Sequence, residues 1–217
     1  GTIENVTDSL PWRVTALATA QAHATTADTL IVGMPIANVL TRYLFPGRRW
    51  ALALATVPFV LPTVVVALAF RSLFGSDLGS GFVIVVLAHA YLNMAVVVRI
   101  VGARWSTIDP RLDIAARTLG ASRWTAFRTV TLPALGPAIA SAAAIVFVFS
   151  FTSLGIVLLL GDSNTRTLES LVLRQTSILL DFQAAAVSAA IQAIVVGSVL
   201  WFLVFWCCSR RCFCIMS

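Results

Sequence analysis

Long apolar stretches, separated by shorter polar ones, dominate the pattern of this 217-residue chain. A helix that crosses a bilayer needs about 20 predominantly apolar residues. Five stretches reach that length, at about 16–43, 50–70, 82–103, 137–160 and 184–206. The first is the most polar, because it carries His23, Asp28 and Pro35. Since apolar stretches of this length form helices in a bilayer, the pattern predicts an all-α bundle of about five membrane helices.

The composition also indicates a membrane protein. Hydrophobic residues make up 59% of the chain and charged residues only 11%, and the mean hydropathy is +0.94. A soluble domain of this size could not cover its surface with so few polar side chains. The net charge is +6, but the arginines lie between apolar stretches rather than on one soluble face. We therefore expect a lipid bilayer around the chain and no nucleic-acid partner.

The positions of the arginines predict the orientation in the membrane. Inner loops of membrane proteins are enriched in Lys and Arg. With the N-terminus outside, 11 arginines lie inside: Arg42, Arg48, Arg49, Arg99, Arg104, Arg111, Arg117, Arg123, Arg128, Arg210 and Arg211. The outer side then holds 4: Arg13, Arg71, Arg166 and Arg174. This difference predicts an N-terminus outside and a C-terminus inside.

The arginine-rich segment between the third and fourth stretches predicts two short helices. Asp109 can cap the first helix, and Pro110 fits its first turn, where an N–H would have no partner anyway. Gly120 can adopt the left-handed conformation that ends such a helix. Ser122 can then cap the second helix, which we expect to stop near Pro133. The orientation places this loop in the cytoplasm, where it would suit docking into a groove of a partner protein.

The same segment, residues 109–133, resembles the coupling loop of binding-protein-dependent ABC importer permeases. The pattern of that loop is Glu-Ala-Ala-x3-Gly-x9-Ile-x-Leu-Pro, and all its spacings are kept here. Ile114 stands at the Glu position, with Asp113 beside it as a partial substitute, and Val130 stands at the Ile position. The resemblance implies contact with a separate ATPase through Asp113, Ala115, Ala116, Gly120, Ala121, Ser122, Leu132 and Pro133.

The resemblance extends over most of the chain. Residues 43–49, 57–63, 87–93 and 149–175 are similar to thiamine and ferric-iron type permeases, whose members often carry two such halves. Residues 1–217 therefore resemble one permease domain, the first half of a longer protein. The resemblance implies a bacterial cytoplasmic membrane, ferric iron or thiamine as the solute, an extracytoplasmic solute-binding protein, a second permease half or subunit, and no cofactor.

Polar residues within the apolar stretches are candidates for lining a translocation path. His89 and Asn93 are four residues apart and share one helix face, and Ser141 and Thr152 share a face of the fourth stretch. Polar side chains at membrane depth face the bundle interior or a water-filled path. The competing interpretations are a hydrogen bond between helices for the first pair and close helix packing for the second.

The sequence contains no catalytic motif. Without a GxxxxGK[ST] loop, the chain is not expected to hydrolyse ATP itself. All four cysteines lie in the tail 207–217, and their spacing, CCxxxCxC, matches no standard zinc pattern, so no metal site is expected. The tail also differs in composition from the rest of the chain. A non-functional fragment of a longer permease therefore stays an alternative, as does a secondary transporter or channel without an ATPase.

Overall fold

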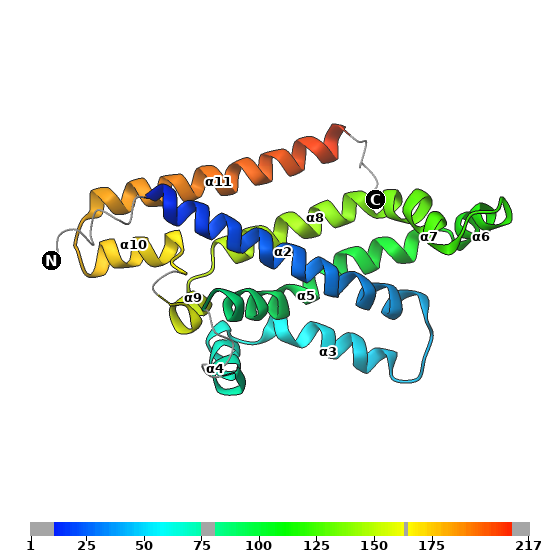
Figure 1. The fold of residues 1–217 in the computed structure, drawn as a ribbon, viewed down its shortest axis with the longest axis horizontal. Coiled ribbons are helices and arrows are strands. Elements are labelled where there is room, and N and C mark those ends of the chain that lie inside the picture. Colours follow the sequence, from blue (N-terminus) through cyan, green and yellow to red (C-terminus); the bar gives the residue numbers. More distant parts are fainter. Residues whose placement is uncertain (1–10, 75–80, 163–164, 210–217) are drawn as a thin grey trace.

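The computed structural model describes residues 11–74, 81–162 and 165–209, which form helices joined by short turns (Figure 1). The predicted all-α fold class is confirmed for these residues. The helices are α2 Pro11–Arg42, α3 Arg48–Val60, α4 Thr63–Phe74, α5 Gly81–Thr107, α6 Pro110–Thr118, α7 Arg123–Ala126, the π-helical turn η1 Phe127–Thr131, α8 Leu132–Phe151, α9 Gly155–Leu160, α10 Leu168–Ser177 and α11 Phe182–Ser209.

Fewer helices than the predicted five are apolar enough to cross a bilayer. Within the described ranges, three helical stretches qualify, at 81–107, 123–151 and 182–205, and the bent pair α3–α4 adds a fourth if it is one span. The 32-residue α2 has the length but is too polar. Three of its polar side chains, Gln21, Thr25 and Thr29, are buried. These side chains face the protein, so their polarity lowers the hydropathy of α2 without placing them against lipid.

The stretch expected as one helix at 50–70 is two helices that meet at an angle of 103°. The break lies at Leu61, which has the extended conformation φ −69°, ψ 137°. Leu61 precedes Pro62, and a residue before proline is disfavoured in the helical conformation. As a result, α4 turns away from the direction of α3 instead of continuing it (Figure 1).

The stretch expected at 137–160 is interrupted as well. α8 ends at Phe151, and α9 begins only at Gly155. A Cβ atom added to Gly155 would lie 2.9 Å from Oγ1 of Thr63 at the start of α4. Arg71 of α4 also donates a hydrogen bond of 3.0 Å to the carbonyl of Leu159 in α9. The two helix breaks therefore lie close together, and α4 and α9 are held against each other.

α5 is the central helix of the bundle and packs against α2, α3, α8 and α9. Of its most apolar window, 61% is buried, against only 6% for the corresponding window of α11. α11 therefore lies at the edge of the bundle. Two hydrogen bonds tie it to α10, from Ser188 to Gln175 (3.0 Å) and from Gln192 to Glu169 (3.1 Å). Burial raises the pKa of Glu169, and the bond from Gln192 opposes this shift.

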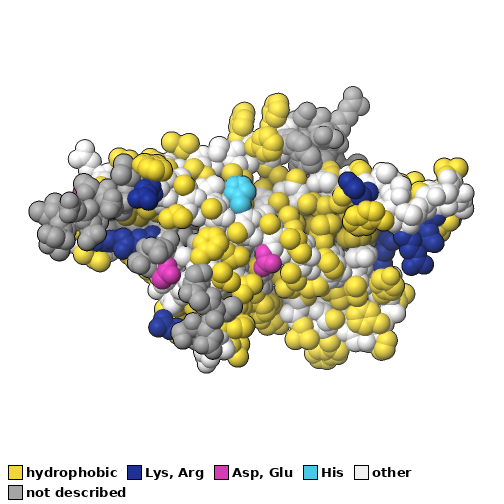
Figure 2. All heavy atoms as spheres, in the orientation of Figure 1, with side chains coloured by type: hydrophobic (Ala, Val, Ile, Leu, Met, Phe, Trp, Pro, Cys, Tyr) yellow, Lys and Arg dark blue, Asp and Glu magenta, His cyan; other side chains and the backbone are white. Residues whose placement is uncertain are grey.

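The surface of the molecule has the distribution expected of a membrane protein. Hydrophobic side chains cover most of its middle, and arginines gather toward its two ends (Figure 2). The loop between α2 and α3 and helices α6 and α7 lie at one end, whereas α4, α9 and α10 lie toward the other (Figure 1). Among the described residues, the arginines at the α2–α3 loop and in α6 and α7, which belong to the inner set, thus lie at the opposite end from Arg71 of α4 and Arg174 of α10, which belong to the outer set.

The contact between α2 and α5 gives a testable prediction. A Cβ atom at Gly33 would lie 2.8 Å from Cγ1 of Val97, a short and stiff side chain. We expect Gly33→Val to force the two helices apart and to lower stability by about 1–3 kcal/mol. Thermal unfolding of the purified chain in detergent measures this effect. Gly197→Val in α11 is the matched control, because no atom lies within 4 Å of its added Cβ. Equal melting temperatures for both variants would contradict close packing at Gly33.

Candidate functional site

The loop that connects α5 to α8 begins with the short helix α6, whose predicted cap is confirmed. The side chain of Asp109 accepts a hydrogen bond of 2.9 Å from the backbone N–H of Arg111, and Pro110 occupies the first turn. No residue of α6 is buried. Asp113 and Ala116 are partly covered, and Ala115 is exposed. The start of this helix is therefore fixed by its own sequence, while its outer face is free to contact another molecule.

Gly120 ends α6 in the left-handed conformation, as predicted, with φ +92°. The N–H of Gly120 donates to the carbonyl of Arg117, and the N–H of Ala121 donates to the carbonyl of Ala116, both at 3.1 Å. This pair of bonds is a Schellman motif, which closes a helix and fixes the direction of the chain that leaves it. Ser122 then caps α7, since its hydroxyl accepts from the N–H of Thr125 at 3.1 Å.

The second helix of the loop does not stop near Pro133, contrary to the prediction. α7, η1 and α8 form one continuous stretch from Arg123 to Phe151. A proline lacks an N–H and normally clashes with the carbonyl four residues earlier. Here the N–H of Leu132 donates to the carbonyl of Phe127, five residues earlier, so the turn before Pro133 is wider than an α-helical turn. Leu132 and Pro133 thus lie inside a helix that starts in the loop and continues into the membrane bundle.

Aromatic stacking fixes the loop to the bundle. The ring of Phe127 lies between Trp105 at the end of α5 (6.2 Å between centroids, 26° between planes) and Trp124 of α7 (5.7 Å, 25°). Nε of Arg104 also donates a hydrogen bond of 3.3 Å to the carbonyl of Ala134. These contacts join the ends of α5 and α8, so a displacement of the loop would act on both helices.

Several large apolar side chains of this loop are exposed on its surface. Leu119 is 89% exposed and Trp124 is 64% exposed, and Leu112 and Ile114 are also exposed. Ile114 is the residue at the Glu position of the loop pattern. Exposed apolar side chains of this size on a loop that carries arginines are typical of a protein contact surface.

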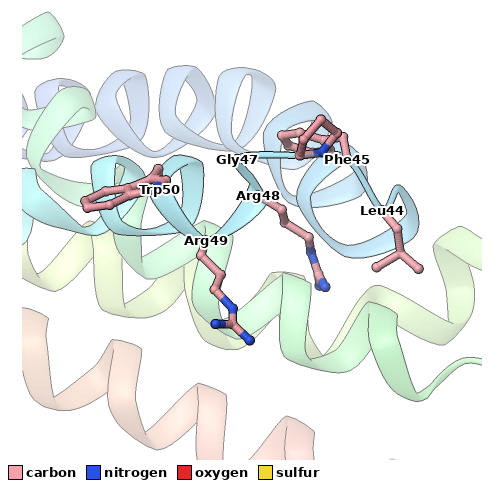
Figure 3. A pocket seen from close by; sticks show the side chains of 7 residues that line it. Leu44, Phe45, Gly47, Arg48, Arg49 and Trp50 are labelled. Atoms are coloured by element: carbon pink, nitrogen blue, oxygen red, sulfur yellow. The ribbon is translucent and has the colours of Figure 1, made fainter.

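A second turn lies at the same end of the molecule, between α2 and α3. Gly47 has φ +90° and precedes α3, and Nε of Arg48 donates a hydrogen bond of 2.6 Å to the carbonyl of Leu40. Figure 3 shows the side chains of this turn around an open hollow, with Trp50 and Leu44 pointing away from each other. The turn exposes Leu44 and Trp50 and thereby adds apolar surface at the end where α6 lies (Figure 1).

A polar cavity lies where the two helix breaks meet α5. It has a volume of about 320 Å³, and its lining includes Phe59, Thr63, His89, Asn93, Thr152 and Ser153. Cavities of this size can hold a small solute. The structure thus brings together three of the four residues predicted to line a path. Ser141 is not among the residues that line it, and its hydroxyl donates to the carbonyl of Pro137 within its own helix at 2.9 Å.

His89 and Asn93 are both buried, at 2% and 4% exposed. Their side chains form different hydrogen bonds. Nδ1 of His89 lies 2.9 Å from the carbonyl of Val85, and because a carbonyl only accepts, Nδ1 carries the proton. Nε2 of His89 is buried without a partner among the described residues, and in the neutral ring it is an acceptor. Nδ2 of Asn93 donates to the carbonyl of His89 at 2.9 Å and to the hydroxyl of Ser150 at 3.4 Å.

Sequence reasoning missed several residues of this cavity and its surroundings. Ser150 points away from Ser141 and Thr152 in helical projection, and for that reason it faces Asn93 on α5. Phe59 and Phe149, whose ring centroids are 6.2 Å apart, come from the two interrupted helices. The signals in the sequence were Pro62 and the polar residues Ser150, Thr152 and Ser153, which mark the two helix breaks but do not show that the breaks meet.

Comparison with known proteins identifies the family of this chain. Residues 29–208 match the family model described as binding-protein-dependent transport system inner membrane component. The chain belongs to this family.

The tail with Cys212 and Cys214 lies outside the described residues, as do the side chains of Cys207 and Cys208.

Individual relatives differ in the solute that they are named for. The molybdate/tungstate transport system permease protein of Thermococcus kodakarensis is 33% identical over 138 residues, 64% of this chain and 56% of that protein. The sulfate transport system permease protein of Escherichia coli K12 is 33% identical over 183 residues, 78% of this chain and 66% of that protein. A thiamine transport system permease protein of Brucella suis biovar 1 is 28% identical over 195 residues, 82% of this chain and 36% of that protein. The chain therefore spans less than two thirds of the length of each of these relatives.

A solved structure has the same fold over nearly the whole chain. It is a methionine ABC transporter in an inward-facing conformation, with a TM-score of 0.74 at 16% identity. The match covers 91% of this chain and 94% of that chain. At this identity the likeness shows a shared fold and gives no information about the solute.

The hydrogen bond between Asn93 and Ser150 gives a testable prediction. We expect Asn93→Leu, which keeps a similar volume, to lower stability by about 1 kcal/mol, because it leaves the buried Ser150 hydroxyl without its partner on α5. Unfolding of the purified chain in detergent measures the change. Ser141→Ala is the control and should change stability by less than about 0.5 kcal/mol, since it removes only a bond within one helix. The prediction fails if the two variants are equally stable.

Proposed function

We propose that this chain is the permease component of an ATP-driven importer in a bacterial cytoplasmic membrane. In this proposal it forms part of the translocation path, together with a second permease half or subunit. Separate ATPase subunits hydrolyse ATP on the inner side, and a soluble binding protein delivers the solute on the outer side. Family membership supports the proposal, as does the absence of a phosphate-binding loop in the sequence.

The observation that carries the proposal is the continuous helical stretch from Arg123 to Phe151. It starts in the exposed loop and ends beside the polar cavity, at the residue before Thr152. A helix of 29 residues is about 44 Å long at 1.5 Å per residue. Because this helix is continuous, force applied to α6 and α7 by an ATPase would reach the cavity through α8.

The loop residues have separate roles in this proposal. Ala115 and Ala116 have small side chains and allow close approach of the ATPase. Gly120, Ala121 and Ser122 set the angle between α6 and α7 through the Schellman motif and the serine cap. Leu132 and Pro133 lie where the loop joins α8, and Asp113 supplies the acidic charge near the missing Glu.

The cavity beside His89, Asn93 and Thr152 is proposed as a station on the translocation path. It is polar but carries no charged side chain among its lining residues, so it would hold a solute weakly. A charge pair within the membrane, which would favour a secondary transporter, is likewise missing from the described residues of this cavity. Weak, neutral contacts suit an importer in which a separate binding protein supplies the affinity.

The names of the relatives are the basis for proposing a solute. The resemblance described in the sequence analysis implies ferric iron or thiamine. Of the three relatives described above, one is named for thiamine and none for ferric iron, whereas two are named for sulfate and for molybdate or tungstate. We therefore propose an oxyanion such as sulfate or molybdate as the solute and keep thiamine as the second candidate. Uptake of each labelled solute by the reconstituted importer distinguishes them.

The coupling role predicts a specific effect of the residue at position 120. A side chain at Gly120 meets no atom within 4 Å, so its cost comes only from φ +92°, about 1–2 kcal/mol for a residue with a Cβ. We expect Gly120→Val to reduce ATP-driven uptake about five- to thirtyfold, with Gly120→Ala less affected. The measurement is solute uptake and stimulated ATP hydrolysis in reconstituted complexes.

Gly197→Val is the matched control for this experiment. Gly197 lies in α11, outside the loop and α8, also has no atom within 4 Å of its added Cβ, and does not have a positive φ. Uptake should therefore stay near the wild-type level in this variant. Wild-type uptake in Gly120→Val would mean that the loop is a passive connection between helices.

The proposed orientation is tested by labelling. In a chain whose four cysteines are replaced by serine, a single cysteine is introduced at Ser177 in α10 or at Thr118 in α6; both residues are exposed. A membrane-impermeant maleimide should label Ser177→Cys in intact cells and Thr118→Cys only after the membrane is opened. The reverse pattern would place the N-terminus inside.

A further inference from the structure

A cavity with two arginines lies away from the coupling loop, between α9 and α10. Its volume is about 540 Å³. The polar side chains of its lining are Asp162, Thr165, Arg166, Ser170, Arg174 and Ser177. None of these residues belongs to the cavity beside His89 or to the loop 109–133. The proposed function leaves this cavity without a role.

The guanidinium groups of Arg166 and Arg174 have no acceptor in the described part of the chain. Both residues are partly buried. An arginine stays charged at any accessible pH. Two positive charges in one lining, without a carboxylate partner among the described residues, favour an anion in this cavity.

The nearby carboxylates already have other partners. Glu169 accepts a hydrogen bond from Gln192 of α11 at 3.1 Å. Asp162 lies in the same lining, where its carboxylate accepts from the N–H of Gly81 (3.3 Å) and from the hydroxyl of Thr165 (3.1 Å). The lining therefore keeps a net positive charge, and Asp162 is positioned by these bonds rather than by an arginine.

Helical spacing places the donors of α10 on one face. Ser170, Arg174 and Ser177 follow each other at intervals of four and three residues, so they point to the same side of the helix. The hydroxyl of Ser170 is used within the cap of α10, where it bonds to Thr167. Ser177 is exposed and its hydroxyl has no bond to another described residue, so it is available as a third donor beside the two arginines.

We propose that this cavity binds a tetrahedral oxyanion of the sulfate or phosphate type. Each guanidinium offers a planar fork of N–H donors that matches two oxygens of such an anion, and Ser177 can donate to a further oxygen. The anion comes either from free sulfate or molybdate or from the phosphate of a lipid headgroup, since the recognising groups are the same. That the cavity opens on the outer side rests on the orientation proposed above, whereas the binding itself does not.

The test is equilibrium dialysis of labelled sulfate and labelled molybdate against the full 217-residue chain in a maltoside detergent, which contains no phosphate. We expect saturable binding by the unchanged chain. Arg166→Gln and Arg174→Gln should each weaken it at least tenfold, with Arg174→Lys less affected because it keeps the charge. Arg49→Gln is the matched control, since it removes the same charge at the opposite end and should bind as the unchanged chain does. Circular dichroism verifies that every variant keeps its helix content.

A second arm distinguishes the source of the anion. Retention of phosphatidylglycerol through detergent exchange is measured for the same variants. Loss of lipid retention in Arg166→Gln and Arg174→Gln, without sulfate or molybdate binding by the unchanged chain, identifies a lipid headgroup as the ligand. The proposal is overturned if the unchanged chain binds neither the oxyanions nor the lipid, or if all variants bind equally. Neither measurement uses ATP or a partner subunit, so a failure of the proposed importer function would leave these results unaffected.

Discussion

The need to satisfy every backbone polar group away from water is the constraint on which the rest of this structure depends. In a bilayer, continuous helices meet this need, and non-helical backbone is tolerated only where it is covered by protein or lines a cavity. The chain breaks its helices at Leu61 and again after Phe151. Both breaks face the cavity that contains His89 and Asn93. The cavity and the helix breaks are therefore one feature, and buried polar side chains lie where the backbone is interrupted.

The same constraint explains the route from the loop to the cavity. Pro133 would normally end a helix, but the π turn at 127–131 lets the helix continue. Because the stretch from Arg123 to Phe151 is continuous, the exposed loop and the cavity lie at the two ends of one helix. The stack of Trp105, Phe127 and Trp124 joins this element to α5, which lines the cavity from the other side. Coupling in the proposed importer thus depends on packing between α5 and α8 more than on any single charge of the loop.

Charge is placed at the two ends of the molecule and has a different use at each. At the end with α6, arginines accompany exposed apolar side chains such as Leu119 and Trp124, as in a protein contact surface. At the other end, Arg166 and Arg174 line a cavity and have no carboxylate partner within the part of the chain that the structure describes, which is the basis of the proposed anion site. The arginines from which the orientation is predicted are therefore also proposed to take part in binding.

The sequence alone determined the features that depend on neighbouring residues. Asp109, Gly120 and Ser122 act on backbone groups within a few residues, so their caps and the left-handed turn follow from local chemistry, and the apolar stretches predict an all-α membrane protein. Only the tertiary structure decided which residues meet across the bundle. The partnership of Asn93 with Ser150, the burial of the polar face of α2 and the cavity between the two breaks depend on how α2, α5 and α8 pack. The continuous helix through Pro133 is of this second kind too, because it depends on the π turn at 127–131, which the local pattern around Pro133 did not predict.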